Sequence, residues 1–221
     1  MATFEEEIVK FYYNQRNYFT IENIAFPAAE KRKGGKGRGE IDLVAIKIDR
    51  NSGKVVEAVC IEVSASVTEH FPFISEQENA DDVKKIIRKF FESDVDEKLK
   101  ELYSGDYKFK FITSEFREDE NLENLLSDKL KQLGANVIEI RRETPSILVK
   151  IEYKGKIKEI EITPFTHILN QLIELNKNNT KYSPNKTLRV VQWINLILKK
   201  KRRSRKLKNN FCFSPPLVTF S

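Results

Sequence analysis

Two carboxylates stand inside apolar runs of this sequence. The run GEIDLVAI (39–46) contains Asp42, and the run CIEVSAS (60–66) contains Glu62. Burying a carboxylate is costly unless a cation, a metal ion or several hydrogen bonds compensate it. Carboxylate oxygens are also the ligands that Mg²⁺ and Mn²⁺ prefer. The two acids are therefore the first candidates for chemistry.

The spacing of the two runs predicts that the acids meet. The segment NSG (51–53) forms a three-residue hairpin loop, with its glycine at the position that needs a positive φ. Counting back from the residues that close this loop places Asp42 opposite Glu62, with Cβ atoms roughly 4.5–5.5 Å apart. Like charges at that distance repel, so the sheet needs a cation between them or a raised pKa in one of them. The alternatives are a register displaced by one residue, or carboxylates that face solvent.

The elements that must position these acids follow from the apolar periodicity. Helical spacing predicts a helix over 3–16, a helix that begins at residue 81 and continues, broken or unbroken, to about Tyr103, and a helix over 120–134. Strands are predicted over 18–26, 40–48, 54–66, 107–114 and 136–140. The order is helix, three strands, helix, strand, helix, strand. This order predicts an α/β fold with a central mixed β-sheet flanked by helices.

The character of the chain changes after Pro145. A hairpin that turns at Lys154 and Gly155 is predicted next, followed by helices near HILNQLIEL and LRVVQWINLIL. We therefore expect three parts: a core over 1–143, a C-terminal hairpin and helical extension over 144–198, and a basic tail over 199–221.

Basic charge is concentrated in two segments. The formal net charge is +6, and the segment 199–208 alone contains eight Lys or Arg, so the rest of the chain has a net charge of −2. A second cluster over 31–38 contains five positive charges just before the run with Asp42. Such clusters are typical of contact with nucleic-acid phosphates. The candidate nucleic-acid-binding residues are Lys31, Arg32, Lys33, Lys36, Arg38, Lys199, Lys200, Lys201, Arg202, Arg203 and Arg205.

Taken in this order, the motifs resemble the PD-(D/E)XK nuclease superfamily, whose members share a restriction-endonuclease-like fold. GEIDLVAI is similar to the first acidic motif, IEVSAS to the second, and DDVKKIIRKFF to the next helix of small archaeal members that resemble Holliday-junction resolvases. The resemblance covers about residues 1–142. It implies a homodimeric, metal-dependent endonuclease that hydrolyses DNA phosphodiester bonds, with junctions or other branched DNA among its substrates. It also implies that Asp42 and Glu62 hold Mg²⁺ or Mn²⁺.

One position departs from the family pattern. The family usually has a lysine two residues after the second acid, and this chain has Ser64 there. A serine can orient a water but has no positive charge, so the charge is expected from the next helix, where Lys84 and Lys89 are the candidates. Either lysine is equally compatible with a solvated helix surface. Glu7 matches a first-helix glutamate of resolvase-like members and is a candidate metal ligand, or it is an ordinary acid at a helix N-terminus.

Two further possibilities remain open at this level. A catalytically impaired nuclease-fold protein would bind DNA without cutting it, and residues 144–221 would alternatively form an interaction or dimerisation module. The acidic start MATFEEEIVKF and the interrupted run VVQWINLIL predict neither an export signal nor a membrane span. We therefore expect a cytoplasmic protein with no membrane partner. Cys60, among Val59, Ile61 and Val63, is expected to be a small apolar core residue.

Overall fold

The computed structural model describes residues 2–25, 40–65, 73, 81–116, 121–175 and 189. The chain forms two compact units, residues 1–170 and 171–221. Of the second unit, only residues 171–175 and 189 are described. The predicted helix near residues 188–198 and the basic tail therefore lie outside the described residues, apart from Arg189.

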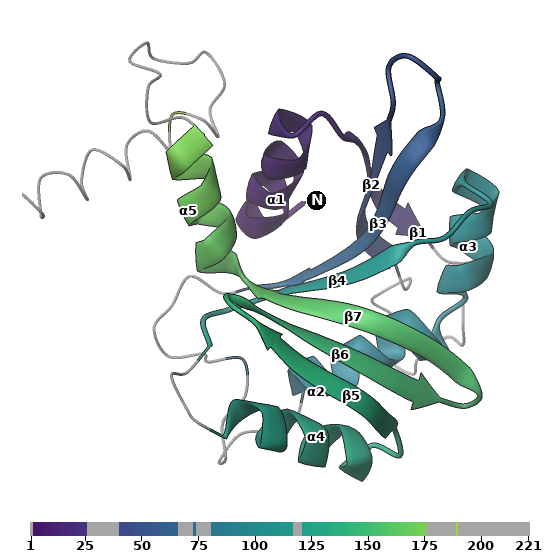
Figure 1. The fold of residues 1–221 in the computed structure, drawn as a ribbon, viewed down its shortest axis with the longest axis vertical. Coiled ribbons are helices and arrows are strands. Elements are labelled where there is room, and N and C mark those ends of the chain that lie inside the picture. The colour runs from purple at the N-terminus through teal and green to yellow at the C-terminus, as the bar shows by residue number, and fades with distance from the viewer. Residues whose placement is uncertain are drawn as a thin grey trace, which may run out of the picture. The chain divides into compact units, whose positions relative to one another are not determined.

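A seven-stranded sheet forms the centre of the first unit (Figure 1). Its strands are β1 (Phe19–Ala25), β2 (Glu40–Ile48), β3 (Val55–Ser64), β4 (Lys108–Thr113), β5 (Asn136–Glu143), β6 (Ser146–Tyr153) and β7 (Lys156–Pro164). They lie side by side in the order β1-β2-β3-β4-β7-β6-β5. β4 is parallel to both of its neighbours, and all other neighbours are antiparallel. The predicted α/β class with a central mixed sheet is confirmed.

Helices pack against both faces of this sheet. α1 (Phe4–Gln15) begins at Thr3, which forms a capping box with Glu6, and packs against β1, β2 and β3. On the other face, α2 (Asp81–Ile87) continues into the π-helix η1 (Arg88–Glu92), which is followed by α3 (Val95–Leu102) and, after β4, by α4 (Leu122–Gln132). α5 (Phe165–Leu175) follows β7. The helix expected from residue 81 is thus present and is broken between Glu92 and Val95.

The apolar core lies between the sheet and the helices α2, η1, α3 and α4. It combines Val44, Cys60 and Phe111 of the sheet with apolar residues of each of these helices, including Phe90 and Leu126. Cys60 has no exposed surface and a free thiol. The prediction that it serves as a small apolar core residue is confirmed.

The β2–β3 hairpin has the predicted register over most of its length. Leu43 pairs with Ile61, so extending the ladder by one residue places Asp42 opposite Glu62. The loop itself is one residue longer than predicted, because the amide of Asp49 bonds to the carbonyl of Lys54 over 2.9 Å.

An irregularity in the pairing compensates for that longer loop. The register shifts between Lys47 and Ile48, and a bulge of this kind absorbs one extra residue. Gly53 has the predicted positive φ, at 67°. The bulge therefore restores the predicted register before the strands reach Asp42 and Glu62.

Residues 146–164 belong to the sheet and do not form an extension of it. The hairpin turns at Lys154 and Gly155 as predicted, and both have positive φ. Its second strand, β7, lies between β4 and β6, where Ile162 pairs with Phe111 and both are fully buried. On the side away from β3, β4 pairs with β7. The boundary predicted between residues 143 and 144 would therefore cut through the sheet and is not a structural boundary. The first compact unit extends to residue 170.

Candidate functional site

Asp42 and Glu62 lie near the start of β2 and the end of β3, in the layer beneath α2 and η1. Asp42 is 9% exposed and Glu62 is 1% exposed. Across the sheet, the row that contains Glu62 continues with Phe111, Ile162 and Ile147, all of which have no exposed surface. The predicted facing arrangement is thus present, and neither a displaced register nor solvent-facing carboxylates describe this chain.

The backbone and one lysine compensate the charge of Asp42. The amide of Val63 donates to Asp42 Oδ2 over 2.8 Å. Lys89 Nζ, which comes from η1, lies 3.8 Å from Asp42 Oδ1 and also donates to the carbonyl of Glu40. Lys89 therefore places an ammonium group between the two carboxylates.

Two lysines face Glu62. Lys89 Nζ donates to Glu62 Oε2 over 2.9 Å. Lys85 Nζ, from α2, lies 3.1 Å from Glu62 Oε1 and donates to the carbonyl of Val63 over 3.3 Å. Despite this ion pair, Oε1 is buried and accepts no hydrogen bond of good geometry. This oxygen of Glu62 is therefore held by an ion pair and by no hydrogen bond.

The surroundings of Glu62 disfavour its charged form. Burial raises the pKa of Glu62 to about 7, and the nearby charge of Asp42 acts in the same direction. Lys85 and Lys89 oppose the shift but do not cancel it. A buried carboxyl that titrates near neutral pH beside a second acid is typical of functional sites.

Of the predicted catalytic residues, Ser64 and Lys84 do not contact the two carboxylates. The Ser64 hydroxyl donates to Asp82 Oδ1 over 2.9 Å. The Lys84 side chain is 54% exposed and pairs with Asp81 at 3.2 Å. Of the two predicted lysines, Lys89 lies at the site. Lys85, the residue after Lys84, lies there as well.

Lys85 was missed in the sequence although a spacing rule could have found it. Residues four apart on a helix differ by about 40° around its axis, whereas residues five apart differ by about 140°. Lys85 and Lys89 therefore share a face, and Lys84 and Lys89 do not. Two lysines on one face of the helix after β3 are the pattern that indicates this site.

Glu7 lies on an exposed part of α1. Its charge acts on Lys10, whose pKa is raised mainly by a hydrogen bond to Glu22. Within the described ranges, no group of three or more His, Cys, Asp and Glu side chains gathers at one point. The structure therefore does not join Glu7 to Asp42 and Glu62.

Thr113 is a second polar side chain that the sequence did not single out. It pairs with Ser64 across β3 and β4 and is fully buried. Its hydroxyl has no hydrogen-bond partner, a condition that costs about 1–3 kcal/mol.

The oxygen atoms that a divalent cation would use are those that contact the two ammonium groups. Lys89 Nζ lies between Asp42 and Glu62, and Lys85 Nζ lies between Glu62 and the carbonyl of Val63. Carboxylate and carbonyl oxygens are hard ligands, and Glu62 Oε1 accepts no hydrogen bond. Asp42 and Glu62 are the two carboxylates that would hold a divalent cation here, and both contact lysine ammonium groups in this structure.

The predicted phosphate-contacting residues over 31–38 and 199–205 lie outside the described residues. The first segment joins β1 to β2, and the described ends of these strands meet at the pair Ala25 and Glu40. Glu40 is two residues from Asp42. The described strand ends that this segment connects therefore lie close to Asp42.

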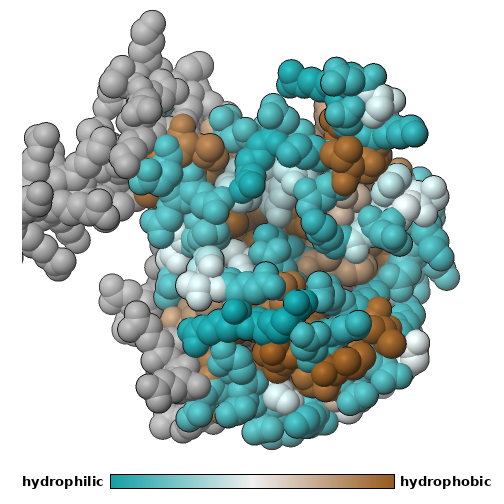
Figure 2. Space-filling view, viewed as in Figure 1, coloured by the Kyte–Doolittle hydropathy of each residue, from teal (hydrophilic) through white to brown (hydrophobic). Residues whose placement is uncertain are grey.

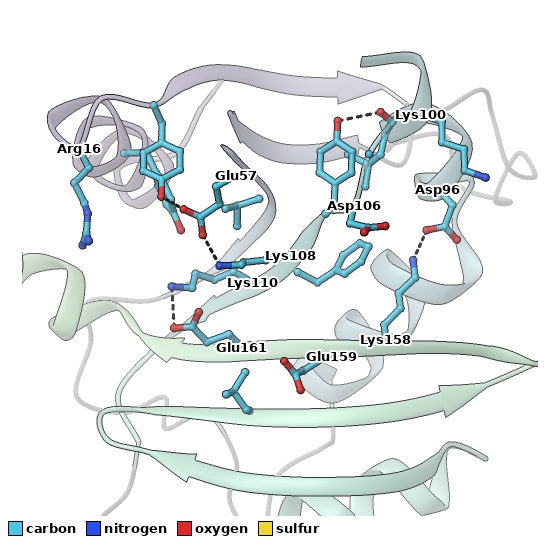
Figure 3. A pocket seen from close by; sticks show the side chains of 18 of the residues that line it. Arg16, Glu57, Asp96, Lys100, Asp106, Lys108, Lys110, Lys158, Glu159 and Glu161 are labelled. Atoms are coloured by element: carbon cyan, nitrogen blue, oxygen red, sulfur yellow. Dashed lines mark hydrogen bonds and ion pairs between the residues drawn. The ribbon is translucent and has the colours of Figure 1, made fainter. Parts of the chain in front are cut away.

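The opposite face of the sheet carries a second polar region, here called the concave face. An open cavity of about 770 Å³ lies there between α1, α3 and the strands β3, β4 and β7 (Figure 3). Glu57 accepts hydrogen bonds from Tyr18 and, over 2.7 Å, from Lys108, while Lys110 pairs with Glu161 at 2.9 Å. Hydrophilic side chains gather over the middle of this face in Figure 2. Acidic and basic side chains both line the cavity.

Comparison with family models, with curated proteins and with solved structures gave no match to this chain. Among the described helices, none is both long enough and apolar enough to cross a membrane. Function is therefore inferred from the geometry of the site and from the chain's own residues.

Proposed function

We propose that the protein is a metal-dependent nuclease of the PD-(D/E)XK type that hydrolyses DNA phosphodiester bonds. The observation that carries this proposal is the buried pair Asp42 and Glu62, which faces two lysines from one side of a helix. The element order α1, β1, β2, β3, α2, β4 supports it, because it is the core order that the family resemblance implies. Asp42 and Glu62 would hold Mg²⁺ or Mn²⁺.

The roles of the site residues follow from their contacts. A bound metal ion polarises the phosphodiester and lowers the pKa of a bound water. Val63 holds one oxygen of Asp42 and so fixes the orientation of that carboxylate. Lys85 and Lys89 supply the positive charge that Ser64 lacks. An ammonium in a site with little water stabilises charge on the phosphate oxygens and contributes about 10²–10³ in rate.

The two basic segments would provide affinity for DNA. Lysines and arginines that contact phosphates bind DNA of any sequence and position it for cleavage. The segment 31–38 ends four residues before Asp42, so its charges would contact the backbone near the scissile bond. The tail over 199–208 would add further contacts.

A second candidate function is a nuclease-fold protein that binds DNA without cutting it. Two observations favour this alternative. The charges of Lys85 and Lys89 already balance those of Asp42 and Glu62, and the Ser64 hydroxyl is engaged with Asp82. A charge-balanced site of this kind is compatible with a structural role.

Cleavage of a DNA panel distinguishes the two functions. The full chain is incubated with a four-way junction, a flap, a single strand and a linear duplex, and with Mg²⁺, Mn²⁺, Ca²⁺ or a chelator. We expect cleavage with Mg²⁺ or Mn²⁺ only, its loss in Asp42→Ala, and its retention in the control Asp81→Ala, which removes an exposed carboxylate.

Two outcomes would contradict the nuclease proposal. Binding to several DNA forms without cleavage in any metal would support the second function. Cleavage that survives in Asp42→Ala would assign the activity to a contaminant or to another site. Sedimentation of the same preparation measures whether the chain is a dimer, as the family resemblance implies.

A further inference from the structure

The β6–β7 hairpin holds η1, the helical turn that carries Lys89. Near its tip, Tyr153 and Lys154 both donate to Glu92 Oε1, over 2.8 and 3.0 Å. The Tyr153 ring also packs edge-on against Phe91, with centroids 5.9 Å apart. The last residues of η1 are thus attached to a hairpin that is distant in sequence.

Lys158 makes the most buried of these attachments. Only 8% of the residue is exposed, although it carries an ammonium group. Its Nζ donates to the carbonyl of Phe90 over 2.6 Å and to Asp96 at the start of α3; Figure 3 shows the bond to Asp96. Phe90 lies in the last turn of η1, where carbonyl groups have no partner within the helix. Lys158 satisfies one of them.

A comparison with Lys156, also on β7, shows which contact is specific to the buried Lys158. Lys156 Nζ binds the same carboxylate, Asp96, over 2.9 Å, and its side chain is 45% exposed. An exposed lysine therefore already links β7 to α3. The buried Lys158 adds the contact with Phe90, supported by the Phe109 ring at 4.3 Å from its Nζ.

We propose that Lys158 is a positioning residue for Lys89. By holding the Phe90 carbonyl, it fixes the π-helical turn in the orientation that directs the Lys89 ammonium to Glu62. π-Helical turns are uncommon and occur frequently at functional sites, and this one needs an external donor at its end. The effect of Lys158 on catalysis rests on the proposed function, whereas the orientation of Lys89 can be measured without it.

The test compares Lys158→Met with the control Lys156→Met in the full chain. Methionine keeps the unbranched apolar stem but cannot donate to Phe90. The primary readout is the rate at which an amine-reactive reagent modifies Lys89, measured site by site with mass spectrometry. Loss of a hydrogen bond from a charged donor predicts a roughly tenfold or greater increase in Lys158→Met, and amide exchange over 88–92 should increase as well. Lys156→Met should match the wild type.

Cleavage kinetics provide the second readout. Lys158 does not lie at the carboxylates, so kcat should fall while KM stays unchanged. If Lys158→Met does not fold, Lys158→Gln, whose shorter side chain ends in a neutral amide, is measured in its place. Unchanged labelling of Lys89 in the folded variant overturns the inference. If labelling increases but the wild-type protein cuts no DNA, the positioning role stands and the proposed nuclease function fails.

Discussion

Strand β3 carries two glutamates, Glu57 and Glu62, that point to opposite faces of the sheet because they are an odd number of residues apart. Glu57 lies on the concave face, and Glu62 lies in the core beneath α2 and η1. Both are bonded to lysines, and yet their pKa values move in opposite directions. The comparison separates an acid that stabilises the fold from one that destabilises it.

The difference comes from what each carboxylate faces. Burial raises the pKa of Glu57, but hydrogen bonds from Lys108 and Tyr18 outweigh burial, and the net shift is downward. Burial also raises the pKa of Glu62, and the facing charge of Asp42 adds to it, so its lysines do not restore the usual value. The facing carboxylates of Asp42 and Glu62 therefore add no stability to the fold. This energetic cost is why the Asp42–Glu62 site, and not the larger concave face, is the candidate for function.

The largest expected effect is on cleavage. Lys85→Met and Lys89→Met should each lower the rate about 10²–10³-fold, because each removes an ammonium from a site with little water. Lys110→Met removes a lysine that is just as firmly paired on the concave face and should leave the rate unchanged. The measurement is single-turnover cleavage at saturating protein.

A second control addresses the helix itself. Lys84→Met removes a neighbouring charge from the exposed side of α2 and should behave like the wild type. Equal losses in Lys84→Met and Lys85→Met would mean that the helix contributes only general positive charge.

The next effect is on stability. Glu62→Gln should raise the free energy of unfolding at pH 8 by about 3 kcal/mol, since the pKa of Glu62 is raised from 4.5 to about 7. Because its pKa is raised in the folded state, the Glu62 carboxyl stabilises the fold when the pH is below its unfolded-state pKa. That contribution is lost as the pH rises to about 7. The advantage of the variant should therefore disappear near pH 4. Urea unfolding measured against pH tests this, and an advantage that does not depend on pH would exclude relief of charge as its cause.

The smallest effect has the opposite sign. Glu57→Gln should lower the free energy of unfolding at pH 7 by about 1 kcal/mol, because it weakens hydrogen bonds to Lys108 and Tyr18 that are partly open to water. The pKa of Glu57 is lowered, so its contribution is present above the unfolded-state value and lost as the pH falls. At acid pH, the free energies of unfolding of both variants should therefore approach that of the wild type, from above for Glu62→Gln and from below for Glu57→Gln. A stabilising Glu57→Gln would remove the contrast between the two faces.

The facing acids could be predicted because a hairpin is a local structure. Its register follows from the loop and from the apolar pattern, and Asp42 opposite Glu62 depends on nothing else in the chain. The loop prediction was wrong by one residue, and the bulge beside Lys47 compensated for the error. The burial of both acids followed from the apolar residues on either side of each.

The lysines and the strand order were harder to predict, for different reasons. A lysine side chain is long and flexible, so a single helix position at the edge of the apolar face does not decide which charge it reaches. The prediction judged Lys84 by its position alone and overlooked that Lys85, four residues before Lys89, shares a face with it. The place of β7 between β4 and β6 depends on contacts between segments far apart in the chain. Nothing in the local pattern of 146–164 distinguishes an inserted hairpin from an appended one.

The position of β7 has a consequence for how the chain is made. Ribosomes complete β4 well before β7, so the central parallel edge of the sheet stays open while residues 114–155 are synthesised. A fragment that ends at residue 143 would contain β5 without its neighbour β6 and β4 without its neighbour β7. Open strand edges pair readily with other chains. We therefore expect a fragment that ends at residue 143 to associate with other chains more readily than a chain that contains β6 and β7.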